Sequence, residues 1–314
     1  MPYSIDHLRR RAKALRRDFA AGAAEATARV AAVLPDIVAL KHADALHVVA
    51  REEGHGSWPK LKIAAELAAL DREARAERLK MALYLGQRWV VDRLLTDDPA
   101  LADANMGLQI ALLQVGVVAD RLAADPAAAT RVIGIRAPIL HLAFSQHWRH
   151  VPGGAEASVA LAEMLVAHGA DVNASYPVGP GADNELSALY GALGHAGNLK
   201  LAEWLLTNGA DPNDNESLYH STELGTSDGL KLLLRHGART EGTNALVRAM
   251  DFDNLEMVQL LLEAGADPNE TPAEHPSGQP PVVIPGLHQA ARRMCSAEIA
   301  RLLIEHGADG TRPF

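Results

Sequence analysis

The chain has 314 residues, of which 48% are hydrophobic but only 4% aromatic, so its core must consist mainly of Ala, Leu and Val, which favours close-packed helices. The formal net charge of −9 argues against a nucleic-acid partner. Cys295 is the only cysteine, which excludes an intrachain disulfide and a zinc site built from several cysteines.

The chain starts with M-P-Y-S-I-D-H-L-R-R-R, which lacks the apolar core of a secretory signal. No later apolar stretch reaches the roughly 18 residues that a membrane-spanning helix needs. We therefore expect a cytoplasmic protein without a membrane partner.

Residues 1–75 are predicted to be helical. An apolar face with three- and four-residue steps, typical of an amphipathic helix, consists of Ile5, Leu8, Ala12, Leu15 and Phe19. The basic run R-R-R-A-K-A-L-R-R at 9–17 is either a solvated helix surface or a docking site for an acidic partner. Residues 44–67 are interpreted as two helices separated by a Gly/Ser/Trp/Pro break.

Two segments farther along the chain match each other. They are V-V-D-R-L-L-T-D-D-P-A-L-A at 90–102 and V-V-A-D-R-L-A-A-D-P-A-A-A at 117–129, and they place Pro99 and Pro126 27 residues apart. This self-similarity predicts a repeated helical unit.

The phrase L-L-x-x-G-A-D, or a close variant of it, then occurs five times, with its glycine at 169, 209, 237, 265 and 307. Each copy predicts an apolar helix that ends at a glycine, where a positive φ costs little. About 20 residues before each glycine lies a second short apolar helix, at 137–143, 187–193, 217–222, 244–250 and 286–291. Because neither helix of such a pair can bury its apolar face alone, the units must stack.

The segments A-P-I-L-H-L-A, G-L-H-Q-A-A and L-L-L-E-A-G-A-D-P-N resemble the ankyrin repeat, whose consensus carries T-P-L-H-x-A-A and L-L-L-x-x-G-A-D-x-N. The resemblance implies an all-α solenoid of about seven helix-turn-helix repeats. Residues 137–314 match it well, and residues 76–136 resemble the degenerate opening repeats of bacterial ankyrin proteins. Residues 1–75 resemble the N-terminal segment of such proteins and are expected to cap the stack.

The repeat spacing departs from the usual value of about 33 residues. The glycine steps are 40, 28, 28 and 42 residues. The short central steps predict shortened loops, and the long ones predict insertions at 172–184 and 268–286. A third insertion, at 149–157, lies between the two helices of its own repeat. Long loops on both sides of short ones are expected to enclose a pocket in the middle of the concave face.

Polar side chains concentrate in the first helices of the central repeats. The stretch L-Y-H-S-T-E-L-G at 218–225 replaces small apolar residues with Tyr219, His220, Ser221, Thr222 and Glu223. The candidate binding residues are His141, Tyr190, Tyr219, His220, Glu223, Asp251, His288 and Arg292, and Arg248 and Asp253 lie in the same register.

Each candidate also has a structural interpretation. The resemblance implies that His141 and His288 bond neighbouring loop backbone, and the two tyrosines can simply pack. Ser221 and Thr222 each need a hydrogen-bond partner if buried. Asp251 and Asp253, on either side of Phe252, are expected to be solvated turn residues.

Motifs for other chemistry are missing. The run H-L-A-F-S-Q-H-W-R-H at 141–150 places only two of its histidines on one helical face, so no metal site is predicted. No phosphate loop, dinucleotide fingerprint or G-x-S-x-G is present, and we expect no cofactor. Cys295 is interpreted as a packing residue.

Two functions remain open. The resemblance implies a binding or adaptor protein that recognises a protein partner through its concave face and loops, since most ankyrin arrays bind and few catalyse. The alternative is an enzyme or small-molecule binder whose pocket is formed by Tyr190, Tyr219, His220, Glu223 and the two long loops. In that case His220 is the general acid or base, Glu223 orients it, and the tyrosines donate to substrate.

Overall fold

The computed structural model describes residues 4–179, 181–182, 184–270 and 285–311. The chain divides into two compact units, Met1–Leu79 with Trp89–Leu101, and Lys80–Arg88 with Ala102–Phe314. The sequence predicted a boundary after residue 75. The structure instead groups residues 89–101, which include most of the first of the two matching segments, with the N-terminal unit. No helix among the described residues is long and apolar enough to cross a membrane.

The N-terminal unit is helical, as predicted. Its elements are α1 (Ile5–Ala20), α2 (Ala24–Ala31), α3 (His42–Glu52), α4 (Trp58–Ala68), the start of α5 (Arg72–Tyr84), α6 (Arg88–Asp97) and most of η1 (Pro99–Asp103). The predicted apolar stripe is confirmed, because Leu8, Ala12 and Leu15 are buried in one core with α3.

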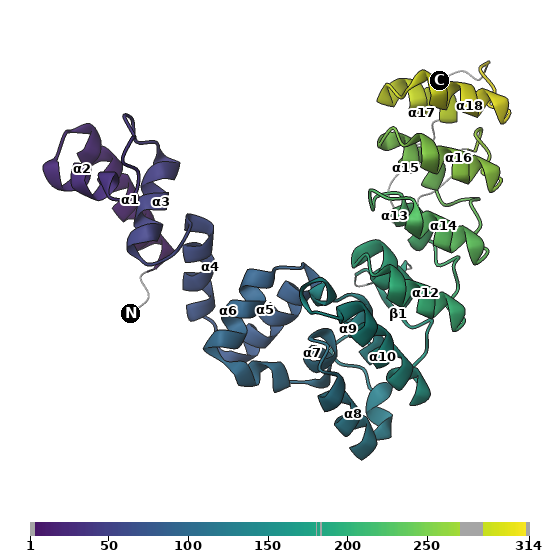
Figure 1. Cartoon of the computed structure of the whole chain (residues 1–314), viewed down its shortest axis with the longest axis horizontal. Helices are drawn as coiled ribbons and strands as arrows, with labels where there is room; N and C mark the ends of the chain where they lie inside the picture. Colours follow the sequence, from purple (N-terminus) through teal and green to yellow (C-terminus); the bar gives the residue numbers. More distant parts are fainter. Residues whose placement is uncertain (1–3, 180, 183, 271–284, 312–314) are drawn as a thin grey trace. The chain divides into compact units, whose positions relative to one another are not determined.

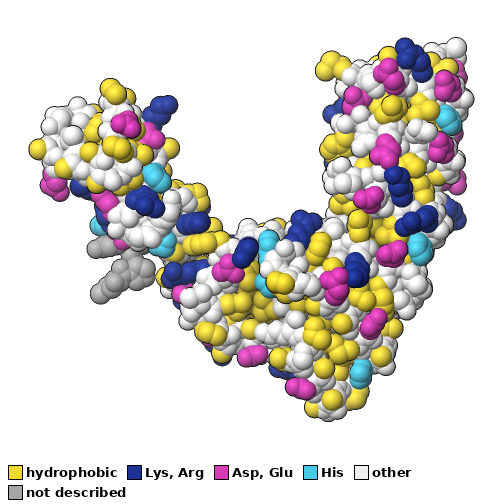
Figure 2. All heavy atoms as spheres, in the orientation of Figure 1, with side chains coloured by type: hydrophobic (Ala, Val, Ile, Leu, Met, Phe, Trp, Pro, Cys, Tyr) yellow, Lys and Arg dark blue, Asp and Glu magenta, His cyan; other side chains and the backbone are white. Residues whose placement is uncertain are grey.

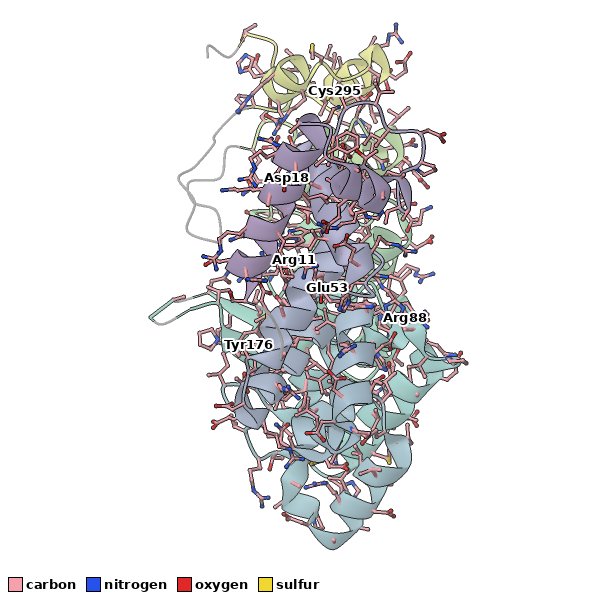
Figure 3. The ribbon with its side chains drawn as sticks, turned by 90° about the vertical axis from the view of Figure 1, so that its left-hand side faces the viewer. Arg11, Asp18, Glu53, Arg88, Tyr176 and Cys295 are labelled. Carbon is pink, nitrogen blue, oxygen red and sulfur yellow. The ribbon has the colours of Figure 1, made fainter. Side chains whose placement is uncertain are left out.

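One arginine of the basic run on α1 forms ion pairs with acidic residues at the end of α3. Arg11 pairs with Glu53, which lies just beyond α3, and with Glu52 at 3.2 Å (Figure 3). Arg29 of α2 also donates to Glu52, at 2.8 and 2.9 Å. These contacts tie three helices of the unit together.

The second unit contains the remaining elements in helix pairs. They are α7 (Met106–Ala111), α8 (Val115–Ala124), η2 (Pro126–Ala129), α9 (Pro138–Ala143), η3 (His147–His150), α10 (Gly154–Ala167), β1 (Ser175–Pro177), β2 (Glu185–Ser187), α11 (Ala188–Tyr190), η4 (Gly191–His195), α12 (Leu199–Thr207), α13 (Ser217–Ser221), α14 (Asp228–Arg235), α15 (Ala245–Asp251), α16 (Leu255–Glu263), α17 (Gly286–Arg293) and α18 (Ala297–Glu305). Counted from α5/α6 to α17/α18, the described residues hold seven helix pairs, the number that the sequence predicts.

The helices of the last repeats stack in two columns (Figure 1). The first helices α13, α15 and α17 form one column, and the second helices α12, α14, α16 and α18 form the other. One continuous apolar core, rich in Leu and Ala, runs between them, from Met106 to Leu303. We call the exposed side of α13, α15 and α17 the first-helix face.

The turns between repeats follow the sequence pattern. The five repeat glycines have φ between +87° and +97°, which confirms that each ends its helix in a left-handed conformation. The Asn two positions after the Asp then reaches the next repeat: the amide of Asn173 donates to Gly209 O at 3.0 Å and accepts from Asp211 N at 2.8 Å. Asn269 makes the same two contacts with Gly307 and Asp309.

The insertions differ in how much of them the structure describes. In the loop at 172–184, a short antiparallel pair forms in which Tyr176 faces Leu186, while residues 180 and 183 lie outside the described residues. Most of the loop at 268–286 also lies outside them, as residues 271–284. The predicted enclosure of a pocket by the two loops therefore remains a prediction.

Candidate functional site

The candidate site begins at the start of α13. Asp214 accepts hydrogen bonds from the backbone N–H of Ser217 at 2.7 Å and from its hydroxyl at 2.6 Å, which fixes where this five-residue helix begins. One turn later the helix carries His220, between Glu216 on one side and Glu223 on the other.

His220 contacts a carboxylate with each of its ring nitrogens. Nδ1 lies 2.9 Å from Glu223 Oε2, and Nε2 lies 3.1 Å from Glu216 Oε2. Burial alone lowers the pKa of His220, but the hydrogen bonds to Glu216 and Glu223 outweigh it and raise the pKa above its ordinary value. Since each ring nitrogen faces an anion, the charged imidazolium is the form that satisfies both contacts.

The charged contacts continue into the next two repeats. Arg248 of α15 donates to Glu223 at 2.7 Å and to Asp251 at 2.9 Å. Asp251 in turn accepts from Arg293 of α17 at 2.7 Å. We call this continuous series the polar ladder; it consists of Glu216, His220, Glu223, Arg248, Asp251 and Arg293.

The polar ladder is partly exposed along most of its length. The exposed fraction of the side chain is 25% for His220, 29% for Arg248 and 44% for Arg293, but only 6% for Glu216. Negative and positive groups alternate from one end to the other. Such a surface offers several oriented charges to a ligand without carrying a strong net charge.

Aromatic rings flank the polar ladder. Tyr190 lies 5.0 Å from the His220 ring, and the Arg248 guanidinium lies 5.5 Å from the Tyr219 ring and 5.0 Å from the Phe252 ring. Tyr190 fits because residue 194 is a glycine: an added Cβ would lie 2.7 Å from the Tyr190 ring. Burial raises the pKa of Tyr190, so its hydroxyl stays protonated at neutral pH.

Two hydroxyls of the stretch at 218–225 are used within their own helix. Ser221 and Thr222 are buried and donate at 2.7 Å to Leu218 O and Tyr219 O, respectively. They do not line the first-helix face. The sequence left their role open, because a letter pattern does not show which hydroxyls bond back to the preceding turn.

The remaining predicted residues lie at various places in the repeats. His141 is buried, and its Nε2 lies 3.2 Å from Ile133 O, the loop contact that the resemblance implied. His288 is half-buried on α17, and Arg292 on the same helix is exposed. It is the neighbouring Arg293, which the sequence analysis did not select, that reaches Asp251.

The expectation that Asp251 is a solvated turn residue was wrong. Only 13% of its side chain is exposed, and it accepts from Arg248, Arg293 and the Gln289 amide. Its position as the last residue of α15 turns it toward α17. Asp253 has a positive φ of 49° and accepts from Ser296 N at 2.8 Å.

Glu216 was not among the candidate residues selected from the sequence. It precedes His220 by four residues, a spacing that places the two on one helical face and was available as a signal. Glu216 also accepts from the Asn184 amide at 2.5 Å, so the long loop contributes to the site.

Other chemistry is not favoured by the described residues. They contain no cluster of three or more His, Cys, Asp or Glu suited to a metal ion. The thiol of Cys295 donates to Met250 O at 3.2 Å, and its burial together with Asp253 and Asp251 raises its pKa, which reduces its reactivity.

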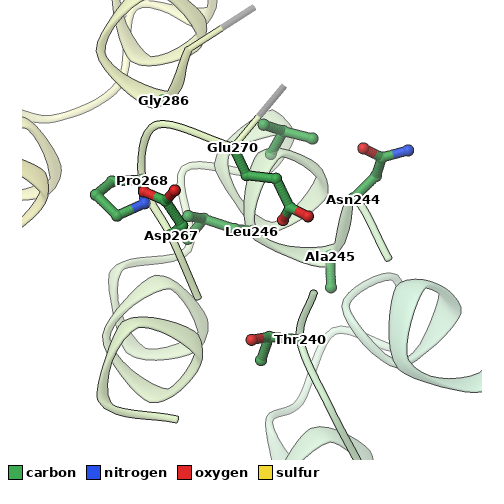
Figure 4. Close-up of a pocket in the computed structure, with 9 residues that line it drawn as sticks. Thr240, Asn244, Ala245, Leu246, Asp267, Pro268, Glu270 and Gly286 are labelled. Carbon is green, nitrogen blue, oxygen red and sulfur yellow. The ribbon is translucent and has the colours of Figure 1, made fainter. Parts of the chain in front are cut away.

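A pocket in the same array lies apart from the polar ladder (Figure 4). It is formed by the turns around Thr240, Asn244 and Asp267. The Glu270 carboxylate in it accepts from Gly242 N at 2.6 Å and so holds two neighbouring turns together. Figure 2 shows acidic and basic side chains interspersed over the repeats nearest the C-terminus.

Comparisons with known proteins concern the repeats. A model of ankyrin repeats, in three copies, matches residues 189–272. The structure is similar to the human ASB11 ankyrin repeat domain, with a TM-score of 0.49 and 19% identity over 67% of this chain and 86% of that one. It is also similar to the ankyrin repeat domain of Bcl-3, a member of the IkappaB family, with a TM-score of 0.45 and 21% identity over 66% of this chain and 89% of that one.

A search of curated proteins found no match. The family match runs from α11 to the loop after α16 and so covers the helix pairs of the central repeats. Residues 189–272 therefore match ankyrin repeats, and the fold is an all-α solenoid of the ankyrin type.

Proposed function

We propose that this chain is a binding protein that holds a protein partner against the first-helix face. Ankyrin repeats generally mediate protein–protein interactions, which supports a binding role. The bacterial origin, the cytoplasmic location and the capping role of residues 1–75 stay predictions from the sequence.

The observation that carries the proposal is the polar ladder, which crosses three successive first helices. An extended row of charges spanning α13, α15 and α17 suits a partner that lies along the stack. Arg248 with Tyr219 and Phe252 adds the arginine and aromatic side chains that dominate binding energy at protein interfaces. Phe252 is 52% exposed, so it is accessible to such a partner.

The geometry favours binding over catalysis. A general base needs a ring nitrogen that accepts a proton from substrate, and both nitrogens of His220 face carboxylates of the same helix region. The predicted orientation of His220 by Glu223 is present, but the Glu216 contact occupies the other nitrogen. A catalytic role of Tyr219, His220 and Glu223 remains a prediction that this arrangement does not favour.

The test is native mass spectrometry of the chain captured from lysate of its source cells. We expect a stoichiometric polypeptide with the wild type and at least about a tenfold loss of it with Arg248→Gln, because a central arginine of an interface contributes about 1–3 kcal/mol or more. Lys231→Gln on α14 is the matched control, since Lys231 pairs with Glu256 on the column of second helices.

Retention of the partner by Arg248→Gln, or equal loss with both variants, would contradict the proposal. A small-molecule adduct that is present in the wild type and absent from the His220→Ala and Tyr219→Phe variants would favour the pocket interpretation instead.

A further inference from the structure

A second cluster, beside the polar ladder, surrounds Arg136. The guanidinium carbon lies 4.3 Å from the ring centroid of Tyr176, 4.9 Å from that of Phe144 and 5.1 Å from that of Tyr84. Tyr84 ends α5, Arg136 lies in the turn before α9, Phe144 directly follows α9, and Tyr176 lies in β1, so distant parts of the second unit build the cluster. We call it the Arg136 cluster.

The Arg136 cluster is held in place from several sides. The carbonyl of Tyr84 accepts from His195 Nε2 at 2.8 Å and from the Gln146 amide at 3.0 Å. The rings of Tyr84 and His195 stack with centroids 4.0 Å apart. Gly191 is required beside the cluster, because a Cβ there would lie 2.6 Å from the Phe144 ring.

Arg136 has a polar contact but no counter-charge. Its Nη2 donates to the Tyr176 hydroxyl at 2.5 Å, and among the residues that the structure describes it forms no ion pair. Arg149, which lies close enough to affect His195, donates to Ala196 O at 2.7 Å and likewise pairs with no described carboxylate. Half-buried Arg136 and exposed Arg149 therefore both lie near His195 without a carboxylate partner in the described part of the chain.

Both cations affect the pKa of His195. Burial lowers the pKa of His195, its hydrogen bond to Tyr84 O acts in the opposite direction, and the charges of Arg136 and Arg149 lower the pKa further. No acidic group is among the causes of this shift. The titratable groups that face His195 are thus Tyr84, Arg136 and Arg149.

We infer that the Arg136 cluster is a binding site for a carboxylate. The Arg136 guanidinium presents its N–H groups in a planar fork, and such a fork pairs with the two oxygens of a carboxylate. The carboxylate comes either from an acidic side chain of a protein or from a free small acid. The site lies next to Tyr190 but does not depend on the polar ladder.

The test follows the His195 ring by NMR in the full chain, with the signal assigned through His195→Gln. The probes are the peptide acetyl-Gly-Glu-Gly-amide, sodium succinate and inorganic phosphate, each compared with sodium chloride at equal ionic strength. We expect both carboxylates to shift the His195 signal saturably and to raise its pKa, because the bound anion offsets the two arginine charges. Whichever of the two binds more tightly identifies a protein or a free acid as the source.

Arg136→Lys keeps the charge but removes the planar fork, so we expect carboxylate affinity to fall at least about tenfold. Arg136→Gln should abolish binding. Arg131→Gln is the matched control: Arg131 is 62% exposed and pairs with Asp125, and its loss should leave binding unchanged.

Three results would overturn the inference: a His195 shift that follows ionic strength alone, wild-type affinity in Arg136→Lys, or phosphate binding more tightly than both carboxylates. None of them bears on the partner of the first-helix face, which is tested separately by Arg248→Gln.

Discussion

His220 and Glu216 lie one helical turn apart and are joined by a 3.1 Å contact between Nε2 and Oε2. Together with the 2.9 Å contact to Glu223, this places the imidazole between two anions. A neutral ring would leave one bare nitrogen facing a carboxylate, which is repulsive. The arrangement therefore stabilises the charged ring and ties α13 to Arg248 in the next repeat through Glu223.

Stability should depend on pH through His220 and His195 with opposite signs. The pKa of His220 is raised above 6.5, so its contribution is fully present below pH 6.5 and is lost as pH rises through the folded-state pKa. The pKa of His195 is lowered below 6.5, so its contribution is present above pH 6.5 and is lost as pH falls. Thermal unfolding of the wild type, His220→Gln and His195→Gln across pH 5 to 9 measures both effects. Parallel curves for the three proteins would contradict this assignment.

Asp251 should matter more for folding than an ordinary surface carboxylate. Its replacement by Ala leaves Arg248 and Arg293 without their shared partner, and we expect the free energy of unfolding to fall by about 2 kcal/mol. The control is Glu256→Ala: Glu256 is 60% exposed and pairs across the surface, so its loss should cost less than the loss of Asp251. Urea unfolding measures both, and equal losses would show that Asp251 is not a structural hub.

Gly194 should tolerate no side chain. In Gly194→Ala the new Cβ meets the Tyr190 ring at 2.7 Å and His220 Cβ at 3.0 Å, so both residues must move. We expect a loss of about 1–3 kcal/mol of stability and a changed His220 NMR signal. Gly116→Ala on α8 is the control, because nothing lies within 4 Å of its Cβ position. An unperturbed His220 signal in Gly194→Ala would refute the packing described here.

Asn173 should contribute to cohesion between repeats. Asn173→Ala removes two hydrogen bonds to the next repeat, and we expect a loss of about 1 kcal/mol in the free energy of unfolding. Asn208→Ala, which removes a bond to Trp204 O within one repeat, should cost less. Hydrogen exchange provides a second measurement. The backbone amide of Asp211 should exchange faster in Asn173→Ala than in the wild type, and should be unchanged in Asn208→Ala.

The repeat architecture was predictable because it depends on local signals. A glycine that ends a helix, followed by Ala and usually Asp, marks a left-handed turn, and all five predicted glycines have a positive φ. The pairing of His220 with Glu223 was predictable for the same reason, since three residues along a helix are neighbours.

What the sequence did not reveal depends on helix rotation and on contacts between repeats. Arg293 rather than Arg292 reaches Asp251, because one position along a helix turns a side chain by about 100°. Asp251 looked like a solvated turn residue because its partners Arg293 and Gln289 lie about 40 residues away. The Arg136 cluster was not predicted, since its members are spread from Tyr84 to Tyr176 and share no spacing.

The most direct test of a binding rather than a catalytic role is ¹⁵N NMR of the His220 ring as a function of pH. The account predicts a titration midpoint above 6.5 and, below that midpoint, two protonated ring nitrogens that each donate to a carboxylate. A midpoint below 6.5, with a neutral ring that keeps one nitrogen unprotonated at pH 7, would contradict it and restore His220 as a candidate base.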